Sequence, residues 1–168
     1  MSNAITLKPV DESNWRQTLI LSVLPAQQRF VAEHVPVAAI ALAKAYIRPD
    51  GLTWLPYAIY ADQQMVGFVA IALKPDQPDD CWVFHFFIDH HHQGRGYGRA
   101  AMQALILLIQ QTQPTCTGMS LVVHPENAAA HSLYRRIGFE ATGDERWGEP
   151  IYRFRFRDDA QQLTSRME

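Results

Sequence analysis

The chain has 168 residues, 48% hydrophobic and 19% charged, which suits one folded domain with a substantial apolar core. Its formal net charge of −2 argues against sequence-independent binding to nucleic acid. No apolar run reaches the roughly 20 residues that a membrane helix needs, and residues 1–6 lack the features of a secretory signal. We therefore expect a cytoplasmic protein without membrane contact.

The first fifty residues predict a short strand followed by helical segments. A strand is expected over residues 5–10, and Ser13 is a suitable N-cap for a following helix. A second helical stretch is expected over residues 26–33, and Pro36 suits the first turn of a third helix. Residues 49–51 form a Pro-Asp-Gly turn.

The hydrophobic period then changes to that of strands. Residues 57–60 and 65–73 predict a hairpin around residues 62–64, and residues 75–80 predict a polar loop. Residues 81–88 are apolar and aromatic, which is typical of a buried strand.

Helix and strand alternate in the rest of the chain. Helices are expected over residues 98–111 and 128–137, and strands over residues 118–124, 139–142 and 151–156. This order predicts a three-layer α/β/α domain with a mixed sheet over residues 1–156, followed by a charged tail over residues 157–168.

The cysteines and histidines do not form a metal-binding pattern. Cys81 and Cys116 lie far apart in the sequence, which favours two reduced, partly buried thiols. The consecutive histidines at 90–92 cannot all point the same way, and His124 and His131 lack a familiar ligand spacing. We expect no metal ion.

A glycine-rich turn over residues 93–99 joins the predicted strand ending at Ile88 to the next helix. Its alternate glycines let the backbone turn sharply and approach a ligand closely. The free amides and the dipole of the helix that follows favour a phosphate or pyrophosphate. The spacing is neither that of a dinucleotide fingerprint nor that of a P-loop, and a flexible loop remains the alternative. The residues concerned are Gln93, Gly94, Arg95, Gly96, Gly98 and Arg99.

A second group of residues lies on the helix predicted after residue 127. Asn127 is a suitable N-cap, and Tyr134 follows two turns later on nearly the same side of the helix. Ala130 lies between them and is small enough to let a ligand pass. The three residues can line one groove, although Tyr134 could instead be an ordinary core aromatic.

Both groups together resemble the GNAT superfamily of N-acetyltransferases, in order, in spacing and over most of the chain. Its acetyl-CoA signature, Gln/Arg-x-x-Gly-x-Gly/Ala, matches at Gln93, Gly96 and Gly98. Residues 28–32, 86–98 and 125–127 also look like bacterial spermine/spermidine acetyltransferases. The superfamily's second pattern matches at Asn127, Ala130, Leu133, Tyr134, Gly138 and Phe139.

The resemblance implies a centrally splayed sheet and acetyl-CoA as cosubstrate. It implies that the turn from Gln93 to Arg99 holds the CoA pyrophosphate, and that the strand end from Phe86 to Ile88 binds the pantetheine arm. Asn127 would contact the same arm, and Tyr134 would lie near the thioester sulfur. The acceptor implied is a small cationic amine such as a polyamine, and a homodimer is compatible with the resemblance.

The chemistry requires an amine that has lost its proton. A free alkylamine has a pKa of about 10.4, so deprotonating it at pH 7 costs about 4.6 kcal/mol. The predicted strand before the turn carries no carboxylate that could act as a base, which leaves His85 or a chain of water molecules. Tyr134 can donate to the leaving thiolate, and a strand amide near Ile88 can donate to the carbonyl oxygen.

Two alternatives stay open. The acceptor could instead be a peptide N-terminus, a lysine or a xenobiotic amine, and the chain could be a module that binds CoA without catalysis. Candidate carboxylates for a polycation are Glu33, Glu126, Glu145 and Glu149, although each could be a solvated surface charge.

Overall fold

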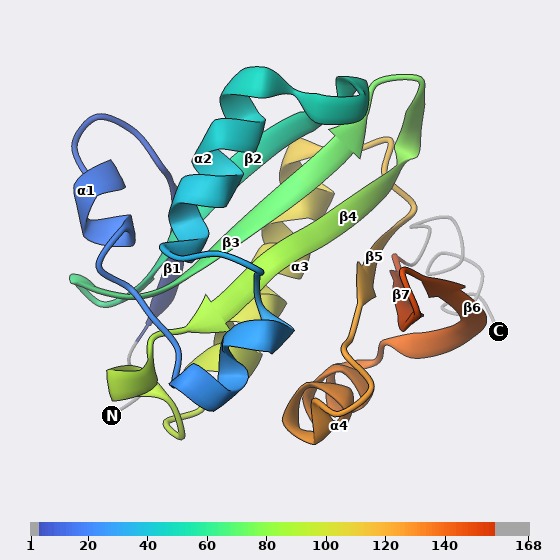
Figure 1. The fold of residues 1–168 in the computed structure, drawn as a ribbon. Helices are drawn as coiled ribbons and strands as arrows, with labels where there is room; N and C mark the ends of the chain where they lie inside the picture. Colours follow the sequence, from blue (N-terminus) through green and yellow to red (C-terminus); the bar gives the residue numbers. More distant parts are fainter. Residues whose placement is uncertain (1–3, 157–168) are drawn as a thin grey trace, which may run out of the picture.

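The computed structural model describes residues 4–156, which form one mixed seven-stranded sheet with helices on both faces (Figure 1). The charged tail predicted over residues 157–168 lies outside the described residues. The strands are β1 (Ile5–Pro9), β2 (Thr53–Ala61), β3 (Gln64–Lys74), β4 (Gln77–Ile88), β5 (Gly118–Val122), β6 (Glu140–Arg146) and β7 (Glu149–Arg155). They lie in the order β1-β2-β3-β4-β5-β7-β6, and all neighbours are antiparallel except β4 and β5.

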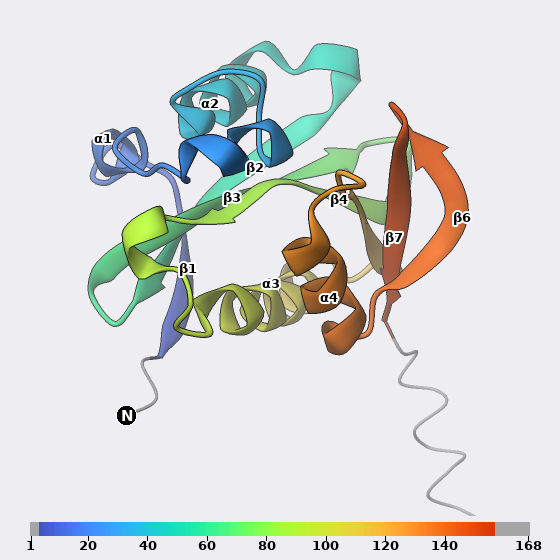
Figure 2. The ribbon, with the colours of Figure 1, turned by 60° about the horizontal axis from the view of Figure 1, so that its bottom comes forward.

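The helices cover the two faces of the sheet in separate sets. Figure 2 shows α1 and α2 over one face and α3 and α4 over the other, which confirms the three-layer α/β/α prediction. Within the described residues, no helix is long and apolar enough to cross a membrane. The helices are α1 (Trp15–Thr18), α2 (Val37–Ile47), α3 (Tyr97–Thr112) and α4 (Ala128–Ile137), with 3-10 turns η1 (Pro25–Phe30), η2 (Pro49–Gly51) and η3 (His90–His92).

Strand β3 shows how one strand supplies both cores. Val69 and Ile71 pack with the α3 side, whereas Phe68 and Ala70 pack with the α2 side, as the two-residue period of a strand requires. All four side chains are fully buried, so β3 anchors both layers.

Two predictions near the N-terminus are wrong in detail. Ser13 does not cap a helix, because its N–H and hydroxyl both donate to the Asp11 carboxylate, at 2.8 and 2.6 Å. The helix that follows, α1, is only four residues long and begins after Asn14. The stretch predicted over residues 26–33 is the 3-10 turn η1, which ends at Phe30.

The polar loop predicted over residues 75–80 is mostly strand. β4 begins at Gln77, which pairs with Lys74 of β3. Residues 77–79 are exposed and polar, so they show no strand-like hydrophobic pattern. Backbone pairing with β3 nevertheless extends the strand beyond the core.

The feature that positions the site is the short contact between β4 and β5. They pair only at Asp80–Gly118, Cys81–Met119 and Trp82–Ser120, and they diverge beyond these pairs, as Figure 1 shows. β4 continues to Ile88 without a strand partner on that edge among the described residues. The centrally splayed sheet is therefore present.

A polar cluster holds the strands together where they begin to part. Arg153 of β7 donates to the Asp80 carboxylate of β4 at 2.5 Å and to the Ser120 hydroxyl of β5 at 2.9 Å. At the same place Gly118 runs against β7 so closely that a Cβ would lie 2.4 Å from the Phe154 carbonyl oxygen. The base of the splay is thus tied across three strands.

We expect Gly118→Ala to lower the free energy of unfolding by about 1–3 kcal/mol, because backbone on a paired strand cannot easily move away from the new methyl group. Urea denaturation measures this loss. Gly98→Ala is the control, since its Cβ would meet only ordinary contacts, at 3.7 Å or more, in a helix. If the Gly118→Ala protein is as stable as the wild type, β5 and β7 can move apart to accommodate the methyl group, and the expectation is wrong.

Candidate active site

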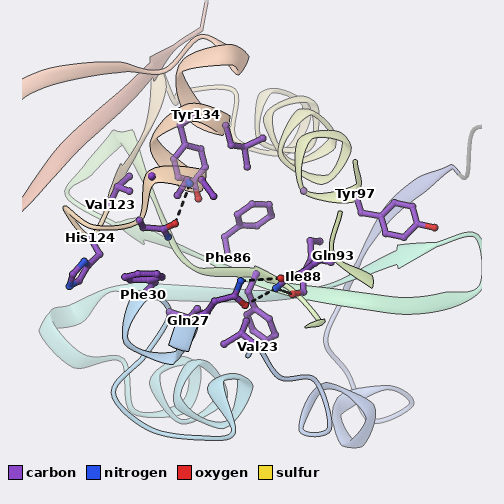
Figure 3. Close-up of a pocket in the computed structure, with 18 of the residues that line it drawn as sticks. Val23, Gln27, Phe30, Phe86, Ile88, Gln93, Tyr97, Val123, His124 and Tyr134 are labelled. Carbon is purple, nitrogen blue, oxygen red and sulfur yellow. Dashed lines mark hydrogen bonds between the residues drawn. The ribbon is translucent and has the colours of Figure 1, made fainter. Parts of the chain in front are cut away.

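The diverging ends of β4 and β5 enclose a cavity of about 510 Å³, which we call the donor cavity (Figure 3). Its walls come from η1, the end of β4, the start of α3, the end of β5 and the first turns of α4. Most of the predicted cofactor-binding residues line it: Phe86, Ile88, Gln93, Gly94, Gly96, Gly98 and Asn127. Arg95 and Arg99 belong to the same turn but do not line the cavity.

The glycine turn has the conformation that its sequence predicts. Gly94 and Gly96 have φ values of 75° and 81°, where other residues are strained, although a Cβ at either position would meet open space. The first helical hydrogen bond of α3 runs from Ala100 N–H to the Gly96 carbonyl. The N–H groups of Gly98 and Arg99 have no acceptor among residues 4–156 and remain for a ligand.

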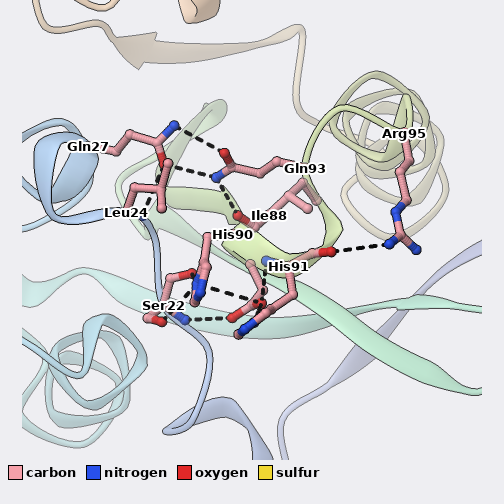
Figure 4. Close-up of polar contacts among 9 residues, drawn as sticks. Ser22, Leu24, Gln27, Ile88, His90, His91, Gln93 and Arg95 are labelled. Carbon is pink, nitrogen blue, oxygen red and sulfur yellow. Dashed lines mark hydrogen bonds and ion pairs between the residues drawn. The ribbon is translucent and has the colours of Figure 1, made fainter.

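Two glutamine side chains fix the start of this turn (Figure 4). The Gln93 amide donates to the Ile88 carbonyl at 2.9 Å and to the Gln27 carbonyl oxygen at 3.0 Å, and Gln27 donates back to Gln93 at 3.1 Å. The signature glutamine is therefore a brace between β4 and η1 in this structure. Arg95 reaches back to the His91 carbonyl at 3.3 Å.

Asp89 holds the turn against the N-terminal segment. Its carboxylate accepts hydrogen bonds from the N–H groups of Ser22, at 2.9 Å, and His91, at 3.0 Å. Burial acts to raise the pKa of Asp89, but these hydrogen bonds together hold it below its ordinary value. A carboxylate oxygen of Asp89 and one ring nitrogen each of His90 and His91 lie within 4.8 Å of one another. His90 contacts the Ser22 carbonyl and His91 contacts Asp89, and these contacts hold the turn in place.

Asn127 and Tyr134 lie on α4 facing the donor cavity. The Asn127 side chain accepts a hydrogen bond from Ala130 N–H at 3.2 Å and so caps α4, as predicted. Tyr134 packs against the rings of Phe86 and Phe139, and only 8% of it is exposed. Its hydroxyl has no hydrogen-bond partner in the described part of the chain. Burial raises the pKa of Tyr134, which keeps it a protonated donor.

A second cavity, of about 650 Å³, adjoins the first, and we call it the acceptor cavity. It lies between the segment that follows η1, helix α2, the middle of β4 and the turn between β6 and β7. The residues that line both cavities are Phe30, Val31, Phe86, Val122 and Tyr134. Tyr134 therefore lies where the contents of the two cavities can meet.

His85 lies on the wall of the acceptor cavity because of a β-bulge. Phe68 and Ala70 of β3 pair with Phe87 and Phe84 of β4, so β4 carries one extra residue, and His85 has a left-handed φ of 52°. As a result, residues 84–86 all line the acceptor cavity.

Both ring nitrogens of His85 have partners. Nδ1 lies 3.0 Å from the Val31 carbonyl, which can only accept, so Nδ1 carries the proton. Nε2 lies 3.4 Å from the Lys44 ammonium group. Burial, chiefly, lowers the pKa of His85, and the Lys44 charge adds to this against the Val31 hydrogen bond. His85 is neutral, and it can accept a substrate proton only if Lys44 moves away.

The predicted carboxylates divide by location. Glu33 and Glu149 line the acceptor cavity, and Glu126 lines the donor cavity and forms an ion pair with Arg29 of η1. Glu145 lines neither cavity. The ion pair and a ring contact between Phe30 and His124 join η1 to the loop before α4 across the splay.

Sequence reasoning missed several residues of the site. Gln27 and Trp147 come into it only through tertiary packing, and no local pattern marks them. Lys44 had a signal: it is the lone charged residue of α2, in the sequence VAAIALAKAYI. A single lysine in so apolar a helix indicates a side chain with a specific partner.

Comparisons with known proteins agree with this geometry. The model of the Acetyltransferase (GNAT) family matches residues 15–139. The chain is 30% identical to a probable spermine N(1)-acetyltransferase of Bacillus subtilis subsp. natto, a match that covers 84% of this chain and 91% of the relative. It is 29% identical, with the same coverage, to a spermine/spermidine N(1)-acetyltransferase of Bacillus subtilis.

Solved structures share the fold at lower identity. An acetyltransferase from Salmonella typhimurium, described as modifying the N-terminal serine of ribosomal protein L7/L12, superposes with a TM-score of 0.70 at 17% identity, covering 93% of this chain and 97% of that one. Spermidine N-acetyltransferase from Vibrio cholerae, in complex with CoA and spermine, gives 0.67 at 17% identity, covering 89% and 93%. The chain belongs to the Acetyltransferase (GNAT) family and is an acetyl-CoA-dependent N-acetyltransferase.

Proposed function

We propose that the chain transfers the acetyl group of acetyl-CoA to a primary amine of a small cationic acceptor, and that a polyamine is the best candidate. The observation that carries this proposal is the junction at Tyr134, where the cavity lined by the glycine turn meets the cavity lined by Glu33 and Glu149. The Bacillus relatives, named for spermine and spermidine, support the choice of acceptor.

Acetyl-CoA would bind along the donor cavity. The N–H groups of Gly98 and Arg99, at the start of a 16-residue helix, suit the pyrophosphate. The pantetheine arm carries amides, and the unpaired edge of β4 over residues 83–88 offers backbone partners, in the way that a peptide adds to a sheet. The Ile88 carbonyl already accepts a hydrogen bond from Gln93, so other backbone N–H and carbonyl groups on this edge would bind the pantetheine arm.

The transfer requires a neutral amine at the junction. Its lone pair forms the new N–C bond to the thioester carbon, the C–S bond breaks, and CoA leaves as a thiolate. The proton that the amine loses passes to water, or to His85 Nε2 if Lys44 moves away from it. A thiol has a pKa of about 8.5 and a phenol about 10, so full proton transfer from Tyr134 to the thiolate is uphill. Tyr134 therefore stabilises the thiolate by donating a hydrogen bond.

The walls and the charged residues of the acceptor cavity suit a flexible cation. Phe84 and Trp147 supply aromatic surface, against which methylene chains and ammonium groups both pack favourably. Glu33 and Glu149 add negative charge. The fold also serves acceptors on protein N-termini, as in the Salmonella protein, so a peptide N-terminus is the alternative acceptor.

We expect Gly96→Glu to weaken CoA binding at least about tenfold, because it places a side chain and a negative charge where backbone would meet phosphate. Calorimetric titration of CoA measures the affinity. Gly143→Glu is the matched control, since Gly143 also has a left-handed φ, of 89°, with open space around it, and lines neither cavity. If both folded variants bind CoA with equal affinity, the pyrophosphate does not bind at this turn.

We expect Tyr134→Phe to lower kcat by about 10²-fold or more while CoA affinity is largely kept, because only the hydroxyl is lost. Thiol release from acetyl-CoA measures kcat. The control is Tyr60→Phe, at a tyrosine equally buried, 8% exposed, that lines neither cavity. If kcat of Tyr134→Phe stays within a factor of about two of wild type, the hydroxyl has no part in the transfer.

We expect spermidine and spermine to be acetylated in preference to neutral monoamines and short peptides, with a KM that rises with salt because the charge pairs are screened. Glu149→Gln should raise the KM for spermidine about two- to fivefold, whereas Glu145→Gln should not change it. A preference for peptides, or no turnover of polyamines, would overturn the acceptor while leaving the transfer chemistry intact.

A further inference from the structure

The acceptor cavity contains a cation where a site for a polycation would be expected to have none. Lys44 is half-buried on α2, with its Nζ 3.4 Å from His85 Nε2, 4.5 Å from the centre of the buried Trp54 ring and 5.8 Å from that of Phe84. It forms no ion pair with any residue between 4 and 156. Burial lowers the pKa of Lys44, and the charge of Glu33 acts in the opposite direction. The wall of the cavity therefore carries a positive charge that no ion pair among residues 4–156 neutralises directly.

The other charged groups of the cavity lie elsewhere on its wall. Glu33 is exposed, and Glu149, on β7, is half-buried. Arg29 is compensated by its ion pair with Glu126. The remaining titratable groups are the exposed His34 beside Glu33, His85 on β4 and Tyr134 on α4. Glu33 thus lies toward solvent, whereas Lys44 lies against the rings of Trp54 and Phe84.

We propose that Lys44 is a positioning residue of the acceptor cavity, which admits the reacting amine only in its unprotonated form and leaves the distal ammonium groups to Glu33 and Glu149. This inference rests on the proposed function. A second ammonium group beside Lys44 is repelled, and a neutral amine is not. Burial, chiefly, and the same Lys44 charge lower the pKa of His85, so its ring adds no second positive charge beside Lys44.

The arrangement resolves how a cation can be a substrate for a reaction that needs a neutral amine. A polyamine has several amino groups, and only the one that reacts must lose its proton. The exposed Glu33 favours an ammonium group and Lys44, against the aromatic rings, disfavours one, so the acceptor is expected to bind with a neutral amine beside Lys44. Lys44 contacts His85, and the next residue of β4, Phe86, lines both cavities.

The test compares Lys44→Met, which keeps an unbranched side chain and removes its charge, with Lys44→Arg, which keeps the charge. Lys74→Met is the control, because Lys74 is exposed and lines neither cavity. The first readout is the NMR titration of the His85 ring in the free protein, identified by its absence in His85→Gln. We expect its midpoint to rise by about one pH unit or more in Lys44→Met and to stay near the wild-type value in Lys44→Arg and Lys74→Met.

The second readout is the pH dependence of kcat with spermidine. Loss of the Lys44 charge raises the pKa of the bound amine and of His85, so the rising limb moves to higher pH in Lys44→Met only. A loss of kcat that is equal at every pH would mean a structural role and overturn the inference, as would an unshifted His85 midpoint. If no amine is acetylated, the proposed acceptor fails instead, and the His85 titration still decides the inference about Lys44.

Discussion

The site depends on one structural constraint: β4 and β5 are neighbours for only three residue pairs. Up to Trp82 and Ser120 the sheet is continuous, and the contacts of Arg153 with Asp80 and Ser120 hold it closed there. Beyond this point no strand among residues 4–156 pairs with that edge of β4, which is costly in a buried sheet unless another group supplies the hydrogen bonds. A cosubstrate with amides along its length meets that requirement, so the donor cavity is a consequence of the split.

The two strands also bring unlike elements to the same place. The end of β4 leads through the glycine turn to the N-terminus of α3, and the end of β5 leads to α4 and Tyr134. The bulge at His85 turns the middle of β4 toward the acceptor cavity. The residues proposed for phosphate binding, thiolate stabilisation and amine selection therefore lie around one opening, although they are far apart in the sequence.

The parts of the site that could be predicted are those encoded locally. The glycine turn and the cap of α4 by Asn127 need only a few adjacent residues, since φ and capping preferences act over one turn. Partners that come from distant segments could not be predicted, such as Gln27 for Gln93 and Lys44 for His85. The same holds for the fold: the sequence predicts the apolar strands, but it predicts a loop at the polar start of β4, because the pairing of these residues with β3 leaves no hydrophobic pattern.

The central claim is that the unpaired edge of β4 and the start of α3 bind acetyl-CoA. Hydrogen exchange of backbone amides, with and without CoA, tests it most directly, because it reports on each segment separately. The account predicts that CoA slows exchange in residues 83–88 and at Gly98 and Arg99, and leaves the edge strand β6 unchanged. Slowed exchange elsewhere, with none in these two segments, would contradict it.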